Sequence, residues 1–243
     1  MVWDRWRWLS RRVRKSRADE YLLDVGCGSG AFTIGMAKRG YQSLGLSWDE
    51  ANQRIAESRA RAAGASKANF DICDVRLLAE RQDLFNCFDI IICSENIEHI
   101  VDDLALMKAM AHCLKPGGRL LISTPYIPRW PWSSQDYGPF PKIEDGRHVR
   151  RGYNRVMLTE LCNHAGLLVE EISFISGPIS QVFTMIMNRV GEVSPLLGWL
   201  MVLPFRIFPP LLDSILTKLF LITPFSIAIE AIKPRIFEPN CDG

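Results

Sequence analysis

Net charge, paired cysteines and long apolar runs are all scarce in this sequence of 243 residues. Lysine and arginine number 29 against 27 for aspartate and glutamate, and a net charge of +2 argues against a protein that coats nucleic acid. None of the seven cysteines forms a CxxC pair, and several lie in apolar runs. We therefore expect reduced thiols in a cytoplasmic protein, and neither disulfide bonds nor a zinc site.

Apolar runs in the chain are shorter than the roughly 18 residues that a membrane-spanning helix needs. The best candidate, residues 193–205, contains two prolines. The basic N-terminus is not followed by the apolar segment of a secretory signal. The sequence therefore predicts neither a spanning helix nor a secretory leader.

Basic charge is concentrated in the first 17 residues, which carry seven lysine and arginine residues against one aspartate. One face of a helix in this region would carry the apolar residues Val2, Trp6, Leu9 and Val13. This pattern predicts a basic, tryptophan-rich helix within residues 1–20 that contacts the inner face of a membrane reversibly. The alternative interpretation is that this helix covers the cofactor site.

From residue 21 onward, short apolar segments alternate with helical patterns. The expected strands are 21–25, 42–46, 69–73, 88–93, 119–124, 167–175 and 225–233. The expected helices are 31–39, 47–63, 102–114 and 154–165. The second helix is expected to begin at Ser47, with Glu50 completing a capping box. This alternation predicts an α/β protein with a doubly wound sheet, formed by one domain over residues 21–243.

Two segments interrupt the alternation. Residues 125–153 are rich in proline and aromatic side chains, and a loop of that length inside a domain is typically a lid or a binding loop. Residues 178–223 are strongly apolar and form an expected helical insertion between strands six and seven. The composition of this insertion is compatible with a membrane surface, a substrate lid or a subunit interface, and the oligomeric state stays open.

A glycine-rich segment, LLDVGCGSG at residues 22–30, joins the first strand to the first helix of the alternation. Such a turn lets a ligand approach the backbone and presents helix N-terminal amides to an anionic group. The segment passes the looser form of the NAD fingerprint, GxGxxA. Asp24 argues against NAD, because a carboxylate beside a pyrophosphate is unfavourable and suits a ligand with a positive end.

This segment resembles the first motif of the class I S-adenosylmethionine-dependent methyltransferases. Three further stretches match in order and spacing: FDICDV at 70–75, CSENIEHI at 93–100 and KPGGRL at 115–120. The second of them resembles small-molecule methyltransferases, including those that methylate quinone precursors. The resemblance implies a Rossmann-like sheet of seven strands with the last one antiparallel, and S-adenosyl-L-methionine as cofactor.

The resemblance also implies roles for single residues at the cofactor site. Asp24 would hold the ammonium of the cofactor, directly or through water, while Asp74 would accept from the adenine amino group and the Val75 amide would meet a ring nitrogen. Ser94 and Glu95 would lie beside the sulfonium and the acceptor. The residues along the methionine part of the cofactor would be Gly26, Cys27, Gly28 and Gly30.

One feature departs from the family, which usually carries an acidic residue at the end of strand two. Ser47 stands at that position, so Ser47, the Trp48 backbone or Asp49 would serve the ribose. The alternative is that Ser47 and Glu50 only cap the helix. Structural alternatives also exist for Asp24, as an acceptor of turn amides, and for Asp74, as a helix cap.

The candidate catalytic bases are His148, in the loop that should face the methyl group, and His99, in the third matching motif. A neutral histidine suits proton removal from an alcohol, because its pKa lies near neutral pH. Each could instead only hold its own loop. We expect no metal, since the carboxylates show no tight ligand spacing.

These motifs together predict an S-adenosylmethionine-dependent enzyme that O-methylates a small or lipid-linked acceptor. A loose likeness around 148–153 favours a glycolipid or polysaccharide pathway, and a quinone or polyprenyl-phenol precursor is the alternative acceptor. A non-catalytic, membrane-docked protein that binds the cofactor is a second hypothesis, because the acidic residue is missing at Ser47.

Overall fold

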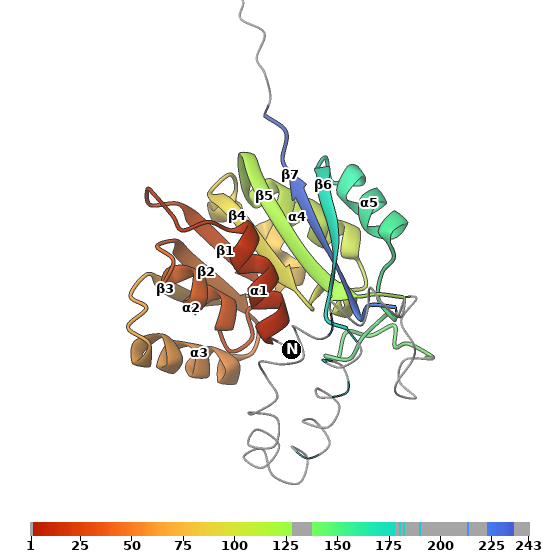
Figure 1. The fold of residues 1–243 in the computed structure, drawn as a ribbon, viewed down its shortest axis with the longest axis horizontal. Helices are drawn as coiled ribbons and strands as arrows, with labels where there is room; N and C mark the ends of the chain where they lie inside the picture. The colour runs from red at the N-terminus through yellow and green to blue at the C-terminus, as the bar shows by residue number, and fades with distance from the viewer. Residues whose placement is uncertain are drawn as a thin grey trace, which may run out of the picture.

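The computed structural model describes residues 2–127, 138–177 and 223–235, together with residues 180, 182, 190 and 213. The middle of the predicted lid loop and nearly all of the predicted insertion at 178–223 therefore lie outside the described residues. Within the described part, a single mixed sheet forms the centre of the molecule (Figure 1).

The sheet has seven strands in the order β3-β2-β1-β4-β5-β7-β6. They are β1 Tyr21–Val25, β2 Gln42–Ser47, β3 Ala68–Ile72, β4 Phe88–Ser94, β5 Leu114–Pro125, β6 Leu168–Ile175 and β7 Ser226–Ile232. Strands β1 to β5 are parallel, whereas β7 runs antiparallel to both of its neighbours, β5 and β6. The predicted doubly wound sheet with an antiparallel last strand is confirmed.

Helices cover both faces of this sheet. They are α1 Val2–Arg12, α2 Ala31–Ala37, α3 Glu50–Ala62, α4 Asp103–Cys113 and α5 Arg155–His164, with short 3₁₀ turns η1 Val75–Glu80, η2 Gln82–Leu84 and η3 Ile97–His99. Strand β4 is apolar on both sides: Ile90 and Ile92 pack with α1 and α2, while Ile91 and Cys93 pack with α4. This explains the continuous apolar run in its sequence.

The apolar face of α1 packs on the sheet. Leu9 and Val13 are completely buried in the same cluster as Ile92 and Leu121, and Trp3 alone among the described tryptophans of this helix is prominently exposed, at 49%. The interpretation of this face as a membrane-contacting surface is therefore wrong, because β4 and β5 already cover it. The alternative interpretation, a helix that covers the cofactor site, agrees better with the structure because α1 lies on the domain, but α1 covers the sheet.

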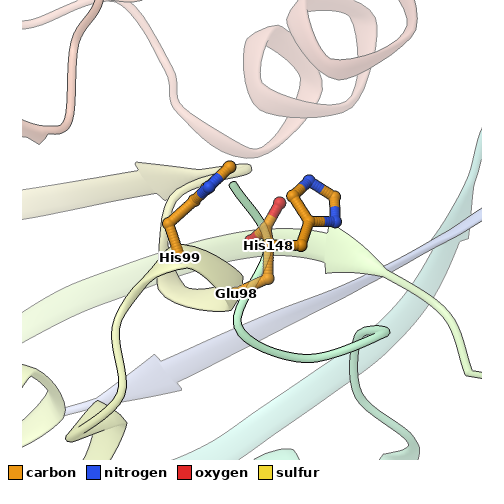
Figure 2. Close-up of side chains that lie close together, drawn as sticks. All are labelled: Glu98, His99 and His148. Carbon is orange, nitrogen blue, oxygen red and sulfur yellow. The ribbon is translucent and has the colours of Figure 1, made fainter. Parts of the chain in front are cut away.

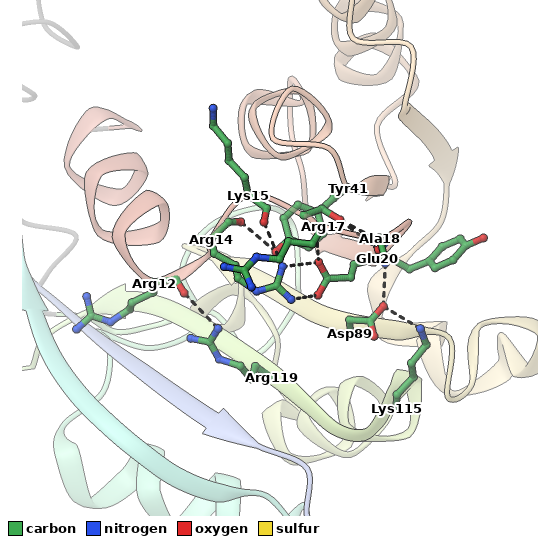
Figure 3. Close-up of polar contacts among 12 residues, drawn as sticks. Arg12, Arg14, Lys15, Arg17, Ala18, Glu20, Tyr41, Asp89, Lys115 and Arg119 are labelled. Atoms are coloured by element: carbon green, nitrogen blue, oxygen red, sulfur yellow. Dashed lines mark hydrogen bonds and ion pairs between the residues drawn. The ribbon is translucent and has the colours of Figure 1, made fainter.

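Polar contacts fasten the segment after α1 (Figure 3). Arg119 of β5 donates to the Arg12 carbonyl over 3.2 Å, and the Tyr41 hydroxyl donates to the Arg14 carbonyl over 3.1 Å. Arg14 also forms a two-point ion pair with Glu20, immediately before β1. Part of the basic charge of the N-terminus therefore holds this segment on the domain.

Strand β5 begins earlier than the sequence predicts. It takes in the whole stretch from Leu114, whereas the sequence predicts that the Lys-Pro-Gly-Gly stretch is a turn before residue 119. The pairing of β4 with β5 is irregular between Phe88 and Ile90, which absorbs these extra residues. No helix in the described part of the chain is long and apolar enough to cross a membrane. The six described cysteines are free thiols, as predicted.

Candidate active site

The glycine turn follows β1 at the carboxyl edge of the parallel strands. Gly26 has φ of +77°, and a Cβ there would lie 2.5 Å from the Asn96 side chain, so only glycine fits. Gly28 has φ of +51°, and an added Cβ would meet nothing within 4 Å. Gly30 also has a left-handed backbone and precedes α2. The turn is thus closed toward Asn96 and open at Gly28, where a ligand can reach the backbone.

Asp24 lies beneath this turn and is only 1% exposed. One carboxylate oxygen accepts from the Thr33 amide over 3.0 Å and from the Thr33 hydroxyl over 2.7 Å. Burial raises the pKa of Asp24 to about 6 against these two bonds. Asp24 therefore fastens the first turn of α2, as the structural alternative predicts. Its contact with the cofactor ammonium stays a prediction.

Cys27, in the same turn, has a partly buried thiol. Burial, together with the charge of Asp24, raises the pKa of this thiol far above its usual range. A thiol that stays protonated is a poor nucleophile. Cys27 is therefore a small turn residue, and its backbone amide holds the turn by donating to the Leu46 carbonyl over 2.9 Å.

Ser47 ends β2 and does not cap a helix. Its hydroxyl accepts from the Asp49 amide over 3.3 Å, and Asp49 is the cap of α3, accepting from the Ala51 amide over 2.8 Å. The predicted capping box of Ser47 with Glu50 is therefore wrong, because the helix begins at Glu50 itself. Trp48 is 70% exposed beside this position. The carboxylate of Asp49, two residues after Ser47, is committed to the cap.

Asp74 follows β3 and caps η1, as its structural alternative predicts. It accepts from the Arg76 amide over 3.0 Å and from the Arg76 Nε over 2.8 and 2.9 Å. These bonds lower the pKa of Asp74. Arg76 also donates to Glu144 over 2.9 Å. Val75 is buried as the first residue of η1. Asp74 and Val75 both stay candidates for contact with the adenine of the cofactor.

Ser94 is the last residue of β4 and Glu95 follows it directly. The Ser94 hydroxyl lies 2.7 Å from the Ser123 hydroxyl of β5. Glu95 has a left-handed backbone with φ of +50°, and its carboxylate forms a 2.8 Å ion pair with Arg5 of α1. The N-terminal helix therefore contributes a charged side chain to this edge of the sheet.

Glu98, His99 and His148 come together beside the end of β4 (Figure 2). The two imidazole rings meet edge to face, with centroids 4.6 Å apart. Glu98 is completely buried and accepts from the Thr124 hydroxyl over 3.1 Å. Burial and the neighbouring Glu95 carboxylate raise the pKa of Glu98 to about 8. The structure thus joins both predicted histidines in one cluster with a buried acid.

This cluster could also hold a metal ion. One ligand atom from each of Glu98, His99 and His148 lies within 4.8 Å of the others. Carboxylate and imidazole are common ligands of divalent transition metals. Glu98 and His99 are neighbours in the sequence but His148 lies far from them, so spacing along the chain does not reveal the group of three. The expected absence of a metal stays a prediction.

The segment that carries His148 is fastened to the chain that follows β4. The Val149 amide donates to the Glu98 carbonyl over 3.0 Å, and Arg150 pairs with Asp103 at the start of α4. Arg150 also donates to the carbonyls of residues 100 and 101, each over 2.7 Å. The position of His148 is therefore set by contacts made by the residues that directly follow it.

Several buried polar atoms at this edge have no hydrogen-bond partner among the described residues. They are Arg5 Nε, Glu95 Oε1, Glu98 Oε1 and His99 Nδ1. A buried polar atom without a partner costs about 1–3 kcal/mol, so a ligand that supplies partners to these four would be favoured. Other such atoms are spread over the described part of the chain, and these four are the ones gathered beside the end of β4. Three of the four can accept, which suits a ligand that carries hydroxyl donors.

Sequence reasoning missed four residues of this region: Arg5, Glu98, Arg76 and Glu144. Glu98 was within the matched CSENIEHI motif, so its acidic side chain beside His99 was an available signal. The sequence pattern predicts that Arg5 faces a membrane surface, together with the other basic residues of α1. Arg76 and Glu144 carried no sequence signal, because an exposed arginine and a loop glutamate are ordinary surface residues.

Family membership follows from a sequence comparison. The profile of the family described as "Methyltransferase domain" matches residues 5–172, which is more than half of the chain. This chain belongs to the S-adenosylmethionine-dependent methyltransferases. The match includes most of α1 and the segments that carry the glycine turn, Asp74, Glu95 and His99. The enzyme class and the cofactor predicted from the motifs are thereby confirmed.

Two curated relatives of this methyltransferase carry the same name. A "Ubiquinone biosynthesis O-methyltransferase" of Marinobacter nauticus is 31% identical over 178 residues, which is 70% of this chain and 73% of the relative. One from Idiomarina loihiensis is 37% identical over 103 residues, covering 42% of this chain and 41% of that protein. The second similarity is thus confined to less than half of each chain.

Solved structures share the fold of this methyltransferase. The phosphoethanolamine N-methyltransferase 2 of Haemonchus contortus, in complex with S-adenosyl-L-methionine, has a TM-score of 0.68 at 18% identity, covering 96% of this chain and 53% of that one. A putative S-adenosylmethionine-dependent methyltransferase of Listeria monocytogenes has a TM-score of 0.63 at 13% identity, covering 97% and 100%. At these identities the likeness supports the architecture alone.

The residues of this methyltransferase fit the cofactor of the family. Gly28 leaves open space at the turn, so a ligand can lie against the backbone. Asp24 provides a buried carboxylate that is ionised above pH 6, which complements an ammonium group. Asp74 stands at the end of β3 as an acceptor for an amino group. The expected residues are thus present and carry suitable charge.

Proposed function

We propose that this methyltransferase transfers a methyl group to a hydroxyl oxygen of a small acceptor of the quinone-precursor type. The observation that carries the proposal is the set of partnerless buried atoms around Glu95, Glu98 and His99. Their acceptor-rich character suits the hydroxyl groups of an incoming molecule. The names of the relatives, which specify O-methylation in ubiquinone biosynthesis, support the same acceptor class over a glycolipid.

The cofactor would be held along the carboxyl edge of β1 to β4. In our proposal Gly26, Cys27, Gly28 and Gly30 lie along its methionine part and Asp24 meets the ammonium. Asp74 and the Val75 amide meet the adenine, with Ser94 and Glu95 next to the reacting groups. Ser47 or the Trp48 backbone serves the ribose, since Asp49 caps α3. When bound, the cofactor supplies an electrophilic methyl group on a sulfonium.

His148 is the base in this proposal, and His99 lies against it. A neutral imidazole takes the proton from the acceptor hydroxyl as the oxygen becomes nucleophilic, a contribution of about 10²- to 10⁴-fold. Glu98 lies in the same cluster, and with a pKa of about 8 it becomes a carboxylate that can balance positive charge on the histidine only above that pH. Alignment of the acceptor with the methyl group supplies the larger share of the rate.

The prediction of a lipid-linked acceptor rests on the apolar composition of residues 178–223. A lipid-linked tail would need an apolar surface, and the apolar segment 178–223 lies outside the described residues. The apolar face of α1 is occupied by the sheet, so it does not supply that surface. A cytoplasmic location and contact with a membrane surface stay predictions.

Methyl transfer from cofactor with a labelled methyl group tests the proposal. Purified protein is offered a catechol that mimics a quinone precursor, the same catechol with both hydroxyls blocked, and a sugar phosphate. We expect label only in the O-methyl product of the free catechol. Transfer to the sugar phosphate alone would overturn the acceptor class, while binding of S-adenosylhomocysteine without transfer to any of them would favour the non-catalytic hypothesis.

A further inference from the structure

The geometry points to Arg76 as a positioning residue that couples the adenine end of the cofactor site to the loop that carries His148. This inference rests on the proposed roles of Asp74 and His148. Arg76 donates to Asp74 from its backbone amide and side chain, and to Glu144 from the other end of the guanidinium. One side chain therefore spans the two places that the reaction must bring together.

On one side, Arg76 occupies the Asp74 carboxylate. The Arg76 amide and Nε reach one carboxylate oxygen at 3.0 and 2.8 Å, and Nε together with a terminal nitrogen reaches the other. These contacts use three hydrogens, since the single Nε hydrogen is shared by both oxygens, and they take up most of the roughly four acceptor positions of a carboxylate. An adenine amino group would therefore compete with Arg76 for the Asp74 carboxylate.

On the other side, Glu144 offers Arg76 a second acceptor. The Glu144 carboxylate takes the 2.9 Å bond from Arg76 on one oxygen and a 2.5 Å bond from the Val101 amide on the other. Val101 lies two residues after His99, and Glu144 lies four residues before His148. A guanidinium that moves from Asp74 toward Glu144 therefore tightens the contact between the two segments that carry the histidines.

The charges favour such an exchange. One guanidinium faces two carboxylates, and the side chains of Arg76 and Asp74 are partly exposed while Glu144 is largely covered. A planar guanidinium can bond two carboxylates at once, which a lysine ammonium does less well. Because coupling between two sites is reciprocal, release of the loop contact must weaken cofactor binding by the same factor.

A double-mutant cycle on S-adenosylhomocysteine binding tests the coupling. Glu144→Gln keeps an acceptor for the Val101 amide but removes the charge that attracts Arg76. We expect Glu144→Gln to weaken S-adenosylhomocysteine binding about fivefold, the scale of an exposed ion pair. This loss is expected even though Arg76 separates Glu144 from Asp74, the residue proposed to contact the adenine. In an Arg76→Met background the same change should have no effect, because the connection is already lost.

A matched control comes from the same loop. Asp145→Asn removes the ion pair with Arg147, which stays within the loop. It should leave S-adenosylhomocysteine affinity unchanged. Amide hydrogen exchange gives a second readout: the cofactor product should protect residues 143–150 in the wild type and in Asp145→Asn, and fail to do so in Arg76→Met.

Two results would overturn the inference. Wild-type affinity in Glu144→Gln would show that Arg76 only supports the Asp74 cap of η1. An equal loss from Glu144→Gln in both backgrounds would show that Glu144 acts without Arg76. Failure of the proposed function is distinguishable, because Asp74→Ala would then bind S-adenosylhomocysteine as tightly as the wild type. Arg76→Lys should restore part of the coupling, as a single ammonium reaches one carboxylate at a time.

Discussion

Replacement of Asp24 by asparagine should make the free energy of unfolding less dependent on pH. Asp24 is buried, and burial raises its pKa from 3.8 to about 6 in the folded protein. The unfolded chain therefore loses this proton at lower pH than the folded protein does. The stability that the protonated carboxyl contributes is complete below pH 3.8 and is lost as pH rises through about 6.

The size of the effect follows from the two pKa values. A shift of one pKa unit corresponds to about 1.36 kcal/mol, so the full change in the free energy of unfolding is about 3 kcal/mol. About 2 kcal/mol of this change falls between about pH 4.5 and 7.5. The asparagine side chain of the Asp24→Asn variant keeps an oxygen that accepts from the Thr33 amide and hydroxyl, and it does not titrate. The stability of the wild type minus that of the variant should thus fall by about 2 kcal/mol over this interval.

Urea unfolding at four pH values between about 4.5 and 7.5 measures this difference. Subtraction of the variant removes the contributions of the other titrating groups. Asp83→Asn is the control: Arg81 lowers the pKa of Asp83, so the contribution of Asp83 is essentially complete above its ordinary value of 3.8 and its difference should stay nearly flat over this interval. A flat difference for Asp24→Asn would refute the reasoning: the Thr33 bonds would then fully offset the cost of burying the charge.

Three other substitutions test separate parts of the structure. Leu9→Ala should lower the free energy of unfolding by about 2–5 kcal/mol in a urea titration, because Leu9 is completely buried between α1 and the sheet; a change below about 0.5 kcal/mol would mean that α1 is not docked. Asp74→Ala should weaken S-adenosylhomocysteine binding by about 1–3 kcal/mol in calorimetry, and unchanged affinity would remove Asp74 from the site. His148→Ala should lower turnover by about 10²- to 10⁴-fold while affinity for the cofactor product stays the same, and a wild-type rate would exclude it as the base.

The strands of the parallel part could be predicted because burial on both faces of the sheet requires a continuous run of apolar residues. The run FDIIIC reads as a strand at any position in a sheet, and β4 covers it together with one more residue. The glycine turn was equally readable, since Gly26 and Gly28 need a left-handed backbone that few other residues adopt. The capping box at Ser47 failed because two cap signals, Ser47 and Asp49, lie two residues apart. The path of the backbone after β2 decided between them.

Sequence by itself determined the class of this protein: the order of its elements, the turn that meets the cofactor and the enzyme family. These features depend on residues that are neighbours in the chain, so their pattern can be recognised in the sequence. The tertiary structure decided what the charged side chains do. Arg5 meets Glu95, and His148 meets His99, only because the sheet and its loops bring distant segments to one edge. Electrostatic and hydrogen-bond partners are set by distances in space, and spacing along the sequence does not carry that information.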